Sequence, residues 1–119
     1  MIYLATVYTS HPQGLEVAYQ EACLLTAAFM RRGMPVFSPI AYGHPLVSQI
    51  GNTGHDFWMR LDLQFLDVAT ALWVAMQPKW DVSRGIAMEI EHAKRRGIPV
   101  MHFAPDPILR DEGATDERT

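Results

Sequence analysis

Two glutamates, Glu89 and Glu91, lie two positions apart in the segment WDVSRGIAMEIEHAKRRGIPV, residues 80–100. The segment is typical of a helix with Ser83 as its N-cap, followed by a short strand. At about 100° per residue, Glu91 points well away from the apolar stripe of this helix and lies one turn before Arg95. Glu91 is therefore expected to form an exposed ion pair with that arginine.

Glu89 is the better candidate for chemistry, because it falls only about 70° from the centre of the stripe, at the edge of the face that packs on a sheet. One turn earlier stands Gly85, which has no side chain, so the space between Glu89 and the helix N-terminus is predicted to be open. A carboxylate there could meet a ligand held by Ser83 and by the first helix amides, which favour anions. The alternative is a hydrogen-bonded boundary glutamate without a chemical role. The stripe is made of small and aliphatic residues: Ile86, Ile90, Ala93 and Gly97.

A second helix pattern, residues 55–69, carries another carboxylate, Asp62, at the edge of its own apolar stripe and one turn after Trp58. This second stripe is predicted to contain Phe57, Leu61, Phe65 and Val68. The two helices flank an apolar strand pattern at 70–76, so Asp62 and Glu89 could face one pocket near the end of that strand.

Apolar strand patterns and helix patterns alternate along the whole chain. The successive elements are expected at residues 2–8, 14–32, 34–39, 55–69, 70–76, 84–96 and 98–103. The order β-α-β-α-β-α-β predicts a three-layer αβα sandwich, flavodoxin- or Rossmann-like, with a mostly parallel sheet of four to five strands. In such sheets ligands bind at the carboxyl ends of the strands.

The length of 119 residues leaves room for one domain, which we place at residues 1–104. Residues 40–54 have a loop-like composition and could form a lid or a binding loop. Residues 105–119 are polar and acidic, without apolar periodicity, and are expected to be disordered after about residue 110.

The composition excludes several classes of function. A net charge of −3 with scattered Lys and Arg argues against a nucleic-acid partner. No run approaches the ~18 apolar residues of a membrane span. Cys23 is the single cysteine, so no intramolecular disulfide can form, which agrees with a cytoplasmic protein. We expect Cys23 to be a small core residue rather than a nucleophile.

No cofactor or metal is expected from the sequence. The five histidines have no short metal-ligand spacing, and neither a phosphate-binding loop nor a dinucleotide-binding motif follows the first strand. Of these histidines, His11 and His44 lie in predicted loops near the expected pocket.

Three short motifs occur together in order: Tyr3-Leu4-Ala5, Gly85-x-x-x-Glu89-x-x-x-Ala93 and Gly97-Ile98-Pro99. In this combination the chain resembles the nucleoside 2-deoxyribosyltransferase superfamily, and most closely a bacterial family of unknown function within it. The resemblance covers roughly residues 2–103. It implies a small nucleoside or nucleotide as the ligand and a homo-oligomer, a dimer or higher, as the assembly.

The resemblance also implies roles for the two carboxylates. Glu89 matches the nucleophile that attacks the anomeric carbon of the sugar, and Asp62 matches the carboxylate that positions the substrate or helps to protonate the departing base. A retaining pair of this kind passes through a covalent glycosyl-enzyme intermediate, with carboxyl groups usually about 5 to 5.5 Å apart. Attack by a second base makes the enzyme a transferase, and attack by water makes it a hydrolase.

The same resemblance suggests residues that contact the substrate. Ser83 and Gly85 match positions that bind the 5′ end of nucleotides in relatives. Tyr3 and the turn at Ser10 and His11 lie where relatives contact base or sugar.

Three further residues have two open interpretations each. Arg84, beside the helix start, could reinforce anion binding or could be an exposed first-turn arginine. Trp58 and Trp80 could stack on a base, or could belong to the core or to an interface.

Two other classes of function remain open. The chain could be a non-catalytic module that binds a nucleotide in the same pocket. It could also be an assembly protein whose exposed aromatic residues, including Phe57 and Trp58, form a subunit interface.

Overall fold

The structure, a computed structural model, describes residues 1–51 and 53–117, with side chains described as far as Asp111. Over these ranges four parallel strands form one sheet, in the order β2-β1-β3-β4. Their bounds are β1 Ile2–Ala5, β2 Val36–Phe37, β3 Ala71–Ala75 and β4 Val100–Phe103. The predicted α/β class and the parallel sheet are confirmed.

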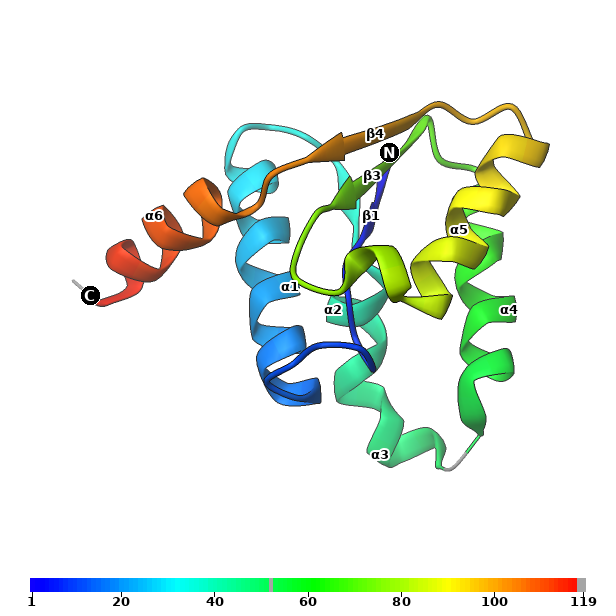
Figure 1. Cartoon of the computed structure of the whole chain (residues 1–119), viewed down its shortest axis with the longest axis horizontal. Helices are drawn as coiled ribbons and strands as arrows, with labels where there is room; N and C mark the ends of the chain where they lie inside the picture. Colours follow the sequence, from blue (N-terminus) through cyan, green and yellow to red (C-terminus); the bar gives the residue numbers. More distant parts are fainter. Residues whose placement is uncertain (52, 118–119) are drawn as a thin grey trace.

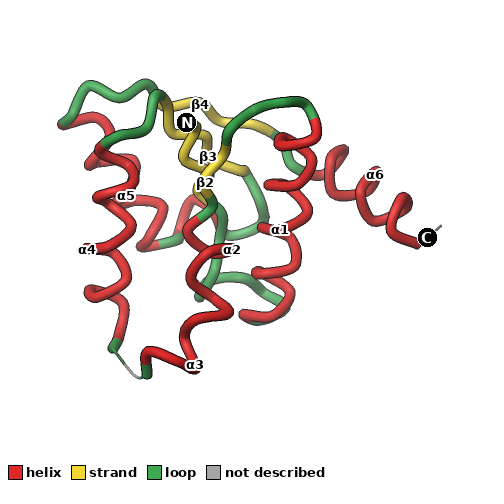
Figure 2. Tube along the Cα trace, turned by 180° about the vertical axis from the view of Figure 1, so that it is seen from behind, coloured by secondary structure: helices red, strands yellow, loops and turns green. Residues whose placement is uncertain are grey.

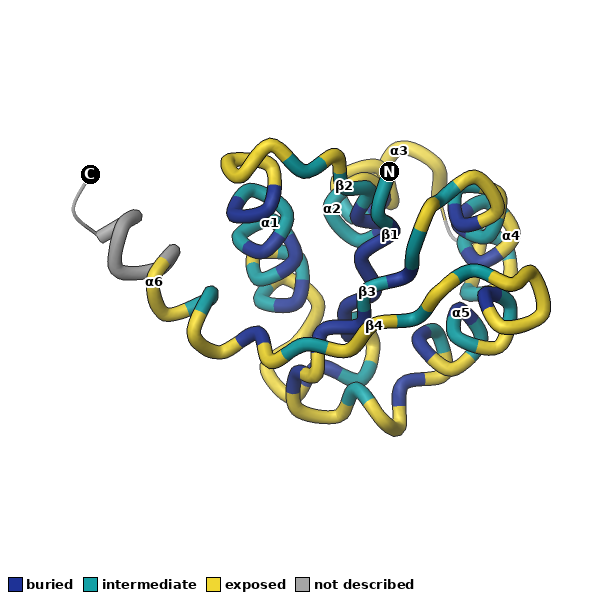
Figure 3. Tube along the Cα trace, turned by 90° about the horizontal axis from the view of Figure 1, so that it is seen from above, coloured by how far each residue is buried: buried dark blue, intermediate teal, exposed yellow. Residues whose placement is uncertain are grey.

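Helices cover both faces of this sheet (Figure 1; Figure 3). Helix α1, Leu15–Arg31, lies on one face, while α4, Gly54–Asp67, and α5, Arg84–Arg95, lie side by side on the other. The predicted order of strands and helices is therefore confirmed, and so are the three layers.

The chain changes direction across the sheet at β1, because β2 pairs with one edge of β1 and β3 pairs with the other. Doubly wound sheets bind ligands where the strand order reverses, at the carboxyl ends of the strands. Helices α4 and α5 both begin toward that end of the sheet (Figure 1). The fold thus places the N-terminal turns of both helices beside the edge where a ligand is expected.

Two apolar clusters form the core, one on each face. Between the sheet and the pair α4 and α5, the cluster includes Tyr3, Leu72 and Ile86. Toward α1, it includes Leu4 and Leu25. The central strands β1 and β3 contribute side chains to both clusters. Both faces of these strands are therefore buried, which explains why their sequences are continuous apolar runs.

The segment at 40–54 was predicted as a loop, but most of it is helical. It contains α2, Pro39–Gly43, a 3₁₀ turn η1, His44–Leu46, and α3, Val47–Ile50. Ser38 caps α2 by accepting a hydrogen bond from the Ala41 amide at 3.1 Å, and a proline stands in the first turn of both α2 and η1. In Figure 2, α2 and α3 run from the end of β2 toward the start of α4. Residue 52 of this segment lies outside the described residues.

The tail also differs from the expectation of disorder, because the structure has a sixth α-helix, α6, Asp106–Glu117. Asp106 and Pro107 suit a first helical turn, where a negative charge and a missing N–H are both tolerated. Ile108 and Leu109 pack against the core cluster on the α1 side. This short apolar pair packs the start of the helix on the core, although it gives no visible periodicity in the sequence.

Within the described ranges, none of the helices combines the length and the apolar character that crossing a bilayer requires.

Candidate functional site

Glu89 lies inside the buried face of α5 rather than at its edge. The side chains that this helix buries are Ile86, Glu89 and Ala93, and Glu89 is only 5% exposed. Gly97, which was predicted to continue the stripe, is exposed and has φ 69°, because it lies in the turn that ends the helix. The predicted Ser83 cap is confirmed, since its Oγ accepts a hydrogen bond from the Ile86 amide at 3.3 Å.

Asp62 is likewise inside the buried face of α4. That face carries Met59, Asp62 and Leu66, and Asp62 is 8% exposed. The predicted stripe was wrong: Val68 is 72% exposed, and the other three residues of the stripe are only partly buried. The helix contacts α5 and also packs on the core cluster beside the sheet, so its buried face is turned toward both.

Tyr3 connects the two layers at this point. It is fully buried in β1, and its hydroxyl donates a hydrogen bond to Oε2 of Glu89. Residues 86 positions apart in the chain therefore meet in one buried polar contact. We call Tyr3, Asp62 and Glu89 the carboxylate cluster.

The electrostatics of the carboxylate cluster follow from its burial. Loss of hydration raises the pKa of Glu89 from 4.5 to about 8; the Tyr3 hydrogen bond opposes this rise, and the charge of Asp62 adds to it. Loss of hydration also raises the pKa of Asp62 from 3.8 to about 7. The pKa of Tyr3 is raised well above 10 by burial and by both carboxylates, so its hydroxyl stays a donor. Both carboxyl groups thus titrate near neutral pH, and the pair passes through a state that holds one proton.

Asp62 has an unused acceptor. Its Oδ1 is buried and has no hydrogen-bond partner among the described residues. A buried carboxylate oxygen without a donor is costly, and such groups are found where a ligand completes the site.

The space next to Gly85 was predicted to be open; side chains of α4 line it and leave room for about one methyl group. A Cβ on Gly85 would lie 3.6 Å from Cε of Met59 and 3.8 Å from Nε2 of His55. The Ser83 hydroxyl lies 4.0 Å from the same point. Sequence reasoning missed both α4 residues, although His55 and Met59 precede Asp62 by seven and three positions and so share its helical face.

The start of α5 presents one charged side chain to solvent. The Arg84 side chain is 71% exposed, and its Nη2 lies 3.6 Å from Oδ1 of Asp56 at the start of α4. This is the weak surface pair that two exposed side chains form. The arginine therefore lies at the rim of the two helix N-termini, and a role in anion binding stays a prediction.

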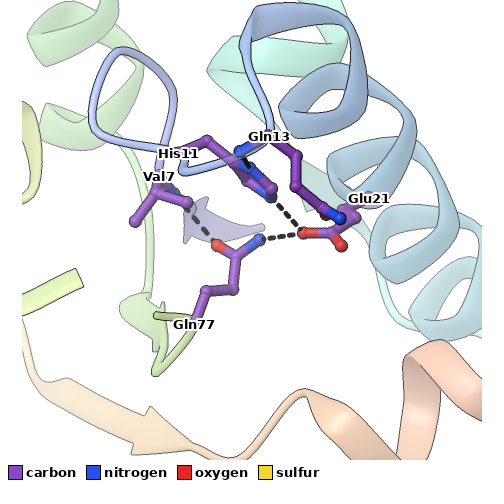
Figure 4. A network of polar contacts seen from close by, with 5 residues as sticks. All are labelled: Val7, His11, Gln13, Glu21 and Gln77. Atoms are coloured by element: carbon purple, nitrogen blue, oxygen red, sulfur yellow. Dashed lines mark hydrogen bonds and ion pairs between the residues drawn. The ribbon is translucent and has the colours of Figure 1, made fainter. Parts of the chain in front are cut away.

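An unpredicted polar network holds the turn after β1 (Figure 4). Nε2 of His11 lies 2.7 Å from Oε1 of Glu21, and Nδ1 of His11 accepts a hydrogen bond from the Gln13 amide at 3.0 Å. Gln77, just after β3, donates to the same Glu21 oxygen at 3.0 Å and accepts from the Val7 amide at 3.0 Å. Since Nδ1 is an acceptor, Nε2 carries the proton and donates to Glu21, so the imidazole is neutral.

The two predicted residues of this turn therefore differ in the structure. Both nitrogens of the buried His11 are used within the protein, so this histidine positions the turn. The Ser10 hydroxyl is buried and has no hydrogen-bond partner among the described residues. Its predicted contact with base or sugar stays a prediction that the geometry permits.

His44 also binds within the protein. Its Nδ1 lies 2.7 Å from the Tyr8 hydroxyl, its Nε2 lies 2.9 Å from Oε2 of Glu16, and its ring stacks on Tyr19 with centroids 4.5 Å apart. These contacts fasten the 3₁₀ turn η1 to the start of α1.

Aromatic rings adjoin the carboxylate cluster on the β2 side. Tyr3 lies 5.8 Å from Phe37, which stacks on Phe65 at 4.1 Å, measured between ring centroids. Trp58 is half-buried and fills the space beside Gly43, where a Cβ would lie 3.1 Å from its ring. Trp58 therefore joins α4 to α2, and its stacking on a base stays a prediction.

The predicted loop tryptophan also has a partner in the fold. Trp80 lies in a short 3₁₀ turn, η2, Trp80–Val82, and its ring contacts that of His102 at a centroid distance of 5.3 Å.

Over the described residues, no group of three His, Cys, Asp or Glu side chains is arranged to hold a metal ion.

The fold and this site together define a doubly wound α/β protein with a buried pair of carboxylates between α4, α5 and β1. The chain belongs to the family described as "Domain of unknown function (DUF1937)", whose model matches residues 1–105. The matched region contains the whole sheet and helices α1 to α5, and it ends just before α6. None of the curated proteins matches the sequence.

Proposed function

We propose that the protein cleaves or transfers the N-glycosidic bond of a nucleoside or a nucleoside 5′-monophosphate, and that its family belongs to the nucleoside 2-deoxyribosyltransferase superfamily. The observation that carries the proposal is the carboxylate cluster. Two buried carboxyl groups with raised pKa values lie close enough to interact through their charges, and one of them accepts a hydrogen bond from a buried tyrosine hydroxyl. The motif resemblance described above puts the nucleophile and its helper at these same two positions, Glu89 and Asp62.

The chemistry proceeds in two displacements. An oxygen of Glu89 attacks C1′ of the sugar, the bond from C1′ to the base nitrogen breaks, and its electrons leave with the base. Protonated Asp62 gives its proton to that base. A water molecule or a second base then attacks C1′, the ester bond to Glu89 breaks, and Asp62 takes up the proton that the attacking group loses.

Each member of the cluster has a property suited to its step. Burial keeps a proton on the carboxyl pair near neutral pH, which supplies the acid. The Tyr3 hydrogen bond opposes the rise in the pKa of Glu89, but burial still gives Glu89 the higher pKa of the pair, about 8 against about 7 for Asp62. The reactive form is therefore the one in which the single proton lies on Asp62, and the Tyr3 hydrogen bond increases its share. Exclusion of water from the buried site favours transfer over hydrolysis.

Ser83, which is 8% exposed, and the first amides of α5 lie at the N-terminal end of this helix, and such an end suits the 5′ hydroxyl or phosphate of the sugar. The homo-oligomer implied by the resemblance remains a prediction.

The test is release of free base from a panel of ribo- and deoxyribonucleosides and their 5′-monophosphates, with and without an acceptor base, followed by chromatography. Wild type is compared with Glu89→Gln and with Glu91→Gln. The second variant removes an exposed carboxylate two residues further along the same helix and serves as the matched control. We expect release by wild type and by the control, and none by Glu89→Gln. Absence of release from every compound would refute the proposal.

A second candidate, a non-catalytic nucleotide-binding module, is favoured by one observation. Glu89 is only 5% exposed, with Met59 lining the space toward the helix start. This module would bind a nucleotide without turnover. In calorimetry Glu89→Gln would then leave the affinity intact, whereas a nucleophile in contact with C1′ predicts a change.

A further inference from the structure

Met59 occupies the gap between α4 and α5. It is 7% exposed, and its Cε lies 3.6 Å from the point where a Cβ on Gly85 would stand. Met59 precedes Asp62 by three residues, and Gly85 precedes Glu89 by four. On each helix, therefore, the contact lies one turn closer to the N-terminus than the carboxylate.

The other sides of the carboxylate cluster are closed by the core. One turn further along each helix stand Leu66 and Ala93, both fully buried in the cluster that packs on β1 and β3. The helix N-termini point toward the carboxyl edge of the sheet (Figure 1), where ligands of such folds enter. A molecule that approaches from this edge meets the thioether of Met59 before it meets either carboxylate.

The pairing of methionine with glycine is suited to a barrier that moves. Methionine is unbranched and has three rotatable side-chain bonds, so it changes conformation at low cost. Beside Gly85, which has no side chain, the methionine has free space of about one methyl group into which it can turn. One turn after Met59 on the same buried face of α4 stands Asp62, which is more than nine-tenths buried and whose Oδ1 has no hydrogen-bond partner within the described chain.

We propose that Met59 is the gate of the carboxylate cluster, and that its side chain must turn aside before a substrate reaches Glu89. The substrate in this statement rests on the proposed function. The closed gap and its opening are properties of the protein alone. The gate therefore also predicts that the size of residue 59 limits how fast any small reagent reaches Glu89.

The experiment measures this access without a substrate. The folded protein is treated briefly with a water-soluble carbodiimide and a small amine, and labelling of Glu89 is measured by peptide mass spectrometry relative to exposed Glu91. Wild type is compared with Met59→Ala and with Leu66→Ala. Leu66→Ala leaves a cavity on the same face of α4, on the far side of Asp62 from the gap, and so controls for loosening of the helix.

We expect the labelling ratio of Glu89 to Glu91 to rise about tenfold in Met59→Ala and to change little in Leu66→Ala, because labelling follows the population in which the carboxylate is accessible. An unchanged ratio in Met59→Ala would overturn the proposal. An equal rise in Leu66→Ala would also overturn it, since general loosening would then explain the access.

Base release by wild type tests the proposed function separately. A selective rise in labelling together with no base release would keep the gate and reject the glycosidic chemistry. Base release without a rise in labelling would keep the glycosidic chemistry and reject the gate.

Discussion

Replacing Glu89 with glutamine should make the protein more stable at alkaline pH. The carboxyl group is buried and its pKa is raised to about 8. As the pH increases, the group loses its proton, and the folded state must then hold a buried negative charge. Glutamine has nearly the same shape, keeps an oxygen that accepts from the Tyr3 hydroxyl, and has no charge to bury.

The sign and size follow from proton linkage. In the unfolded chain Glu89 ionises near 4.5, and in the folded protein near 8. Between these values the folded state binds more protons, so the free energy of unfolding falls as pH rises and levels off above about 8. At ~1.4 kcal/mol per pKa unit the rise sets a ceiling of about 5 kcal/mol, and partial hydration makes about 2 kcal/mol a reasonable expectation.

The assay is urea unfolding, followed by circular dichroism, of wild type, Glu89→Gln and Glu91→Gln at pH 5, 7 and 9. We expect the stability gained in Glu89→Gln to be small at pH 5 and to reach about 2 kcal/mol at pH 9. The exposed control should follow wild type at each pH within ~0.5 kcal/mol. A gain that does not depend on pH, or a variant that is less stable than wild type at pH 9, would refute the reasoning.

Three other predictions concern the contacts around the site. Tyr3→Phe removes the hydrogen bond that lowers the pKa of Glu89, so the acid limb of the pH profile of kcat/KM should move to higher pH; an unmoved limb would contradict this role. Asp67→Asn weakens the contact to His92, 2.5 Å away. The His92 hydrogen bond lowers the pKa of Asp67, so the loss in Tm should be present at pH 7 and should shrink as the pH falls through that pKa. An equal loss in Tm at pH 7 and at a pH below that pKa would contradict this role of the hydrogen bond. Gln77→Ala leaves a buried backbone N–H without its acceptor and should cost roughly 1–3 kcal/mol in urea unfolding, whereas a neutral variant would show that water replaces it.

The sequence was sufficient for the local features. Continuous apolar runs at β1 and β3, with helix patterns between them, indicate a parallel sheet covered on both faces, because each strand must bury both sides. The Ser83 cap and the exposed pair of Glu91 and Arg95, 4.0 Å apart, follow from spacing along a single helix. Signals of this kind depend on neighbours in the chain, so they can be read without the fold.

The helical short segments and the tail were harder to predict for a physical reason. Residues 40–50 and α6 have weak apolar periodicity, and they are helical through capping, prolines and a few contacts such as Ile108 and Leu109 on the core. Contacts of a few residues with distant parts of the chain leave almost no pattern in composition.

The sequence by itself determined the order of the elements and the presence of two carboxylates, Asp62 and Glu89, on the helices that flank β3. Only the tertiary structure decided that both carboxylates are buried, that the Tyr3 hydroxyl donates a hydrogen bond to one of them, and that Met59 contacts α5 at Gly85. The reason is that periodicity defines a face of a helix only relative to its own axis. How far the helix is rotated toward its neighbour depends on packing between residues that are remote in the chain.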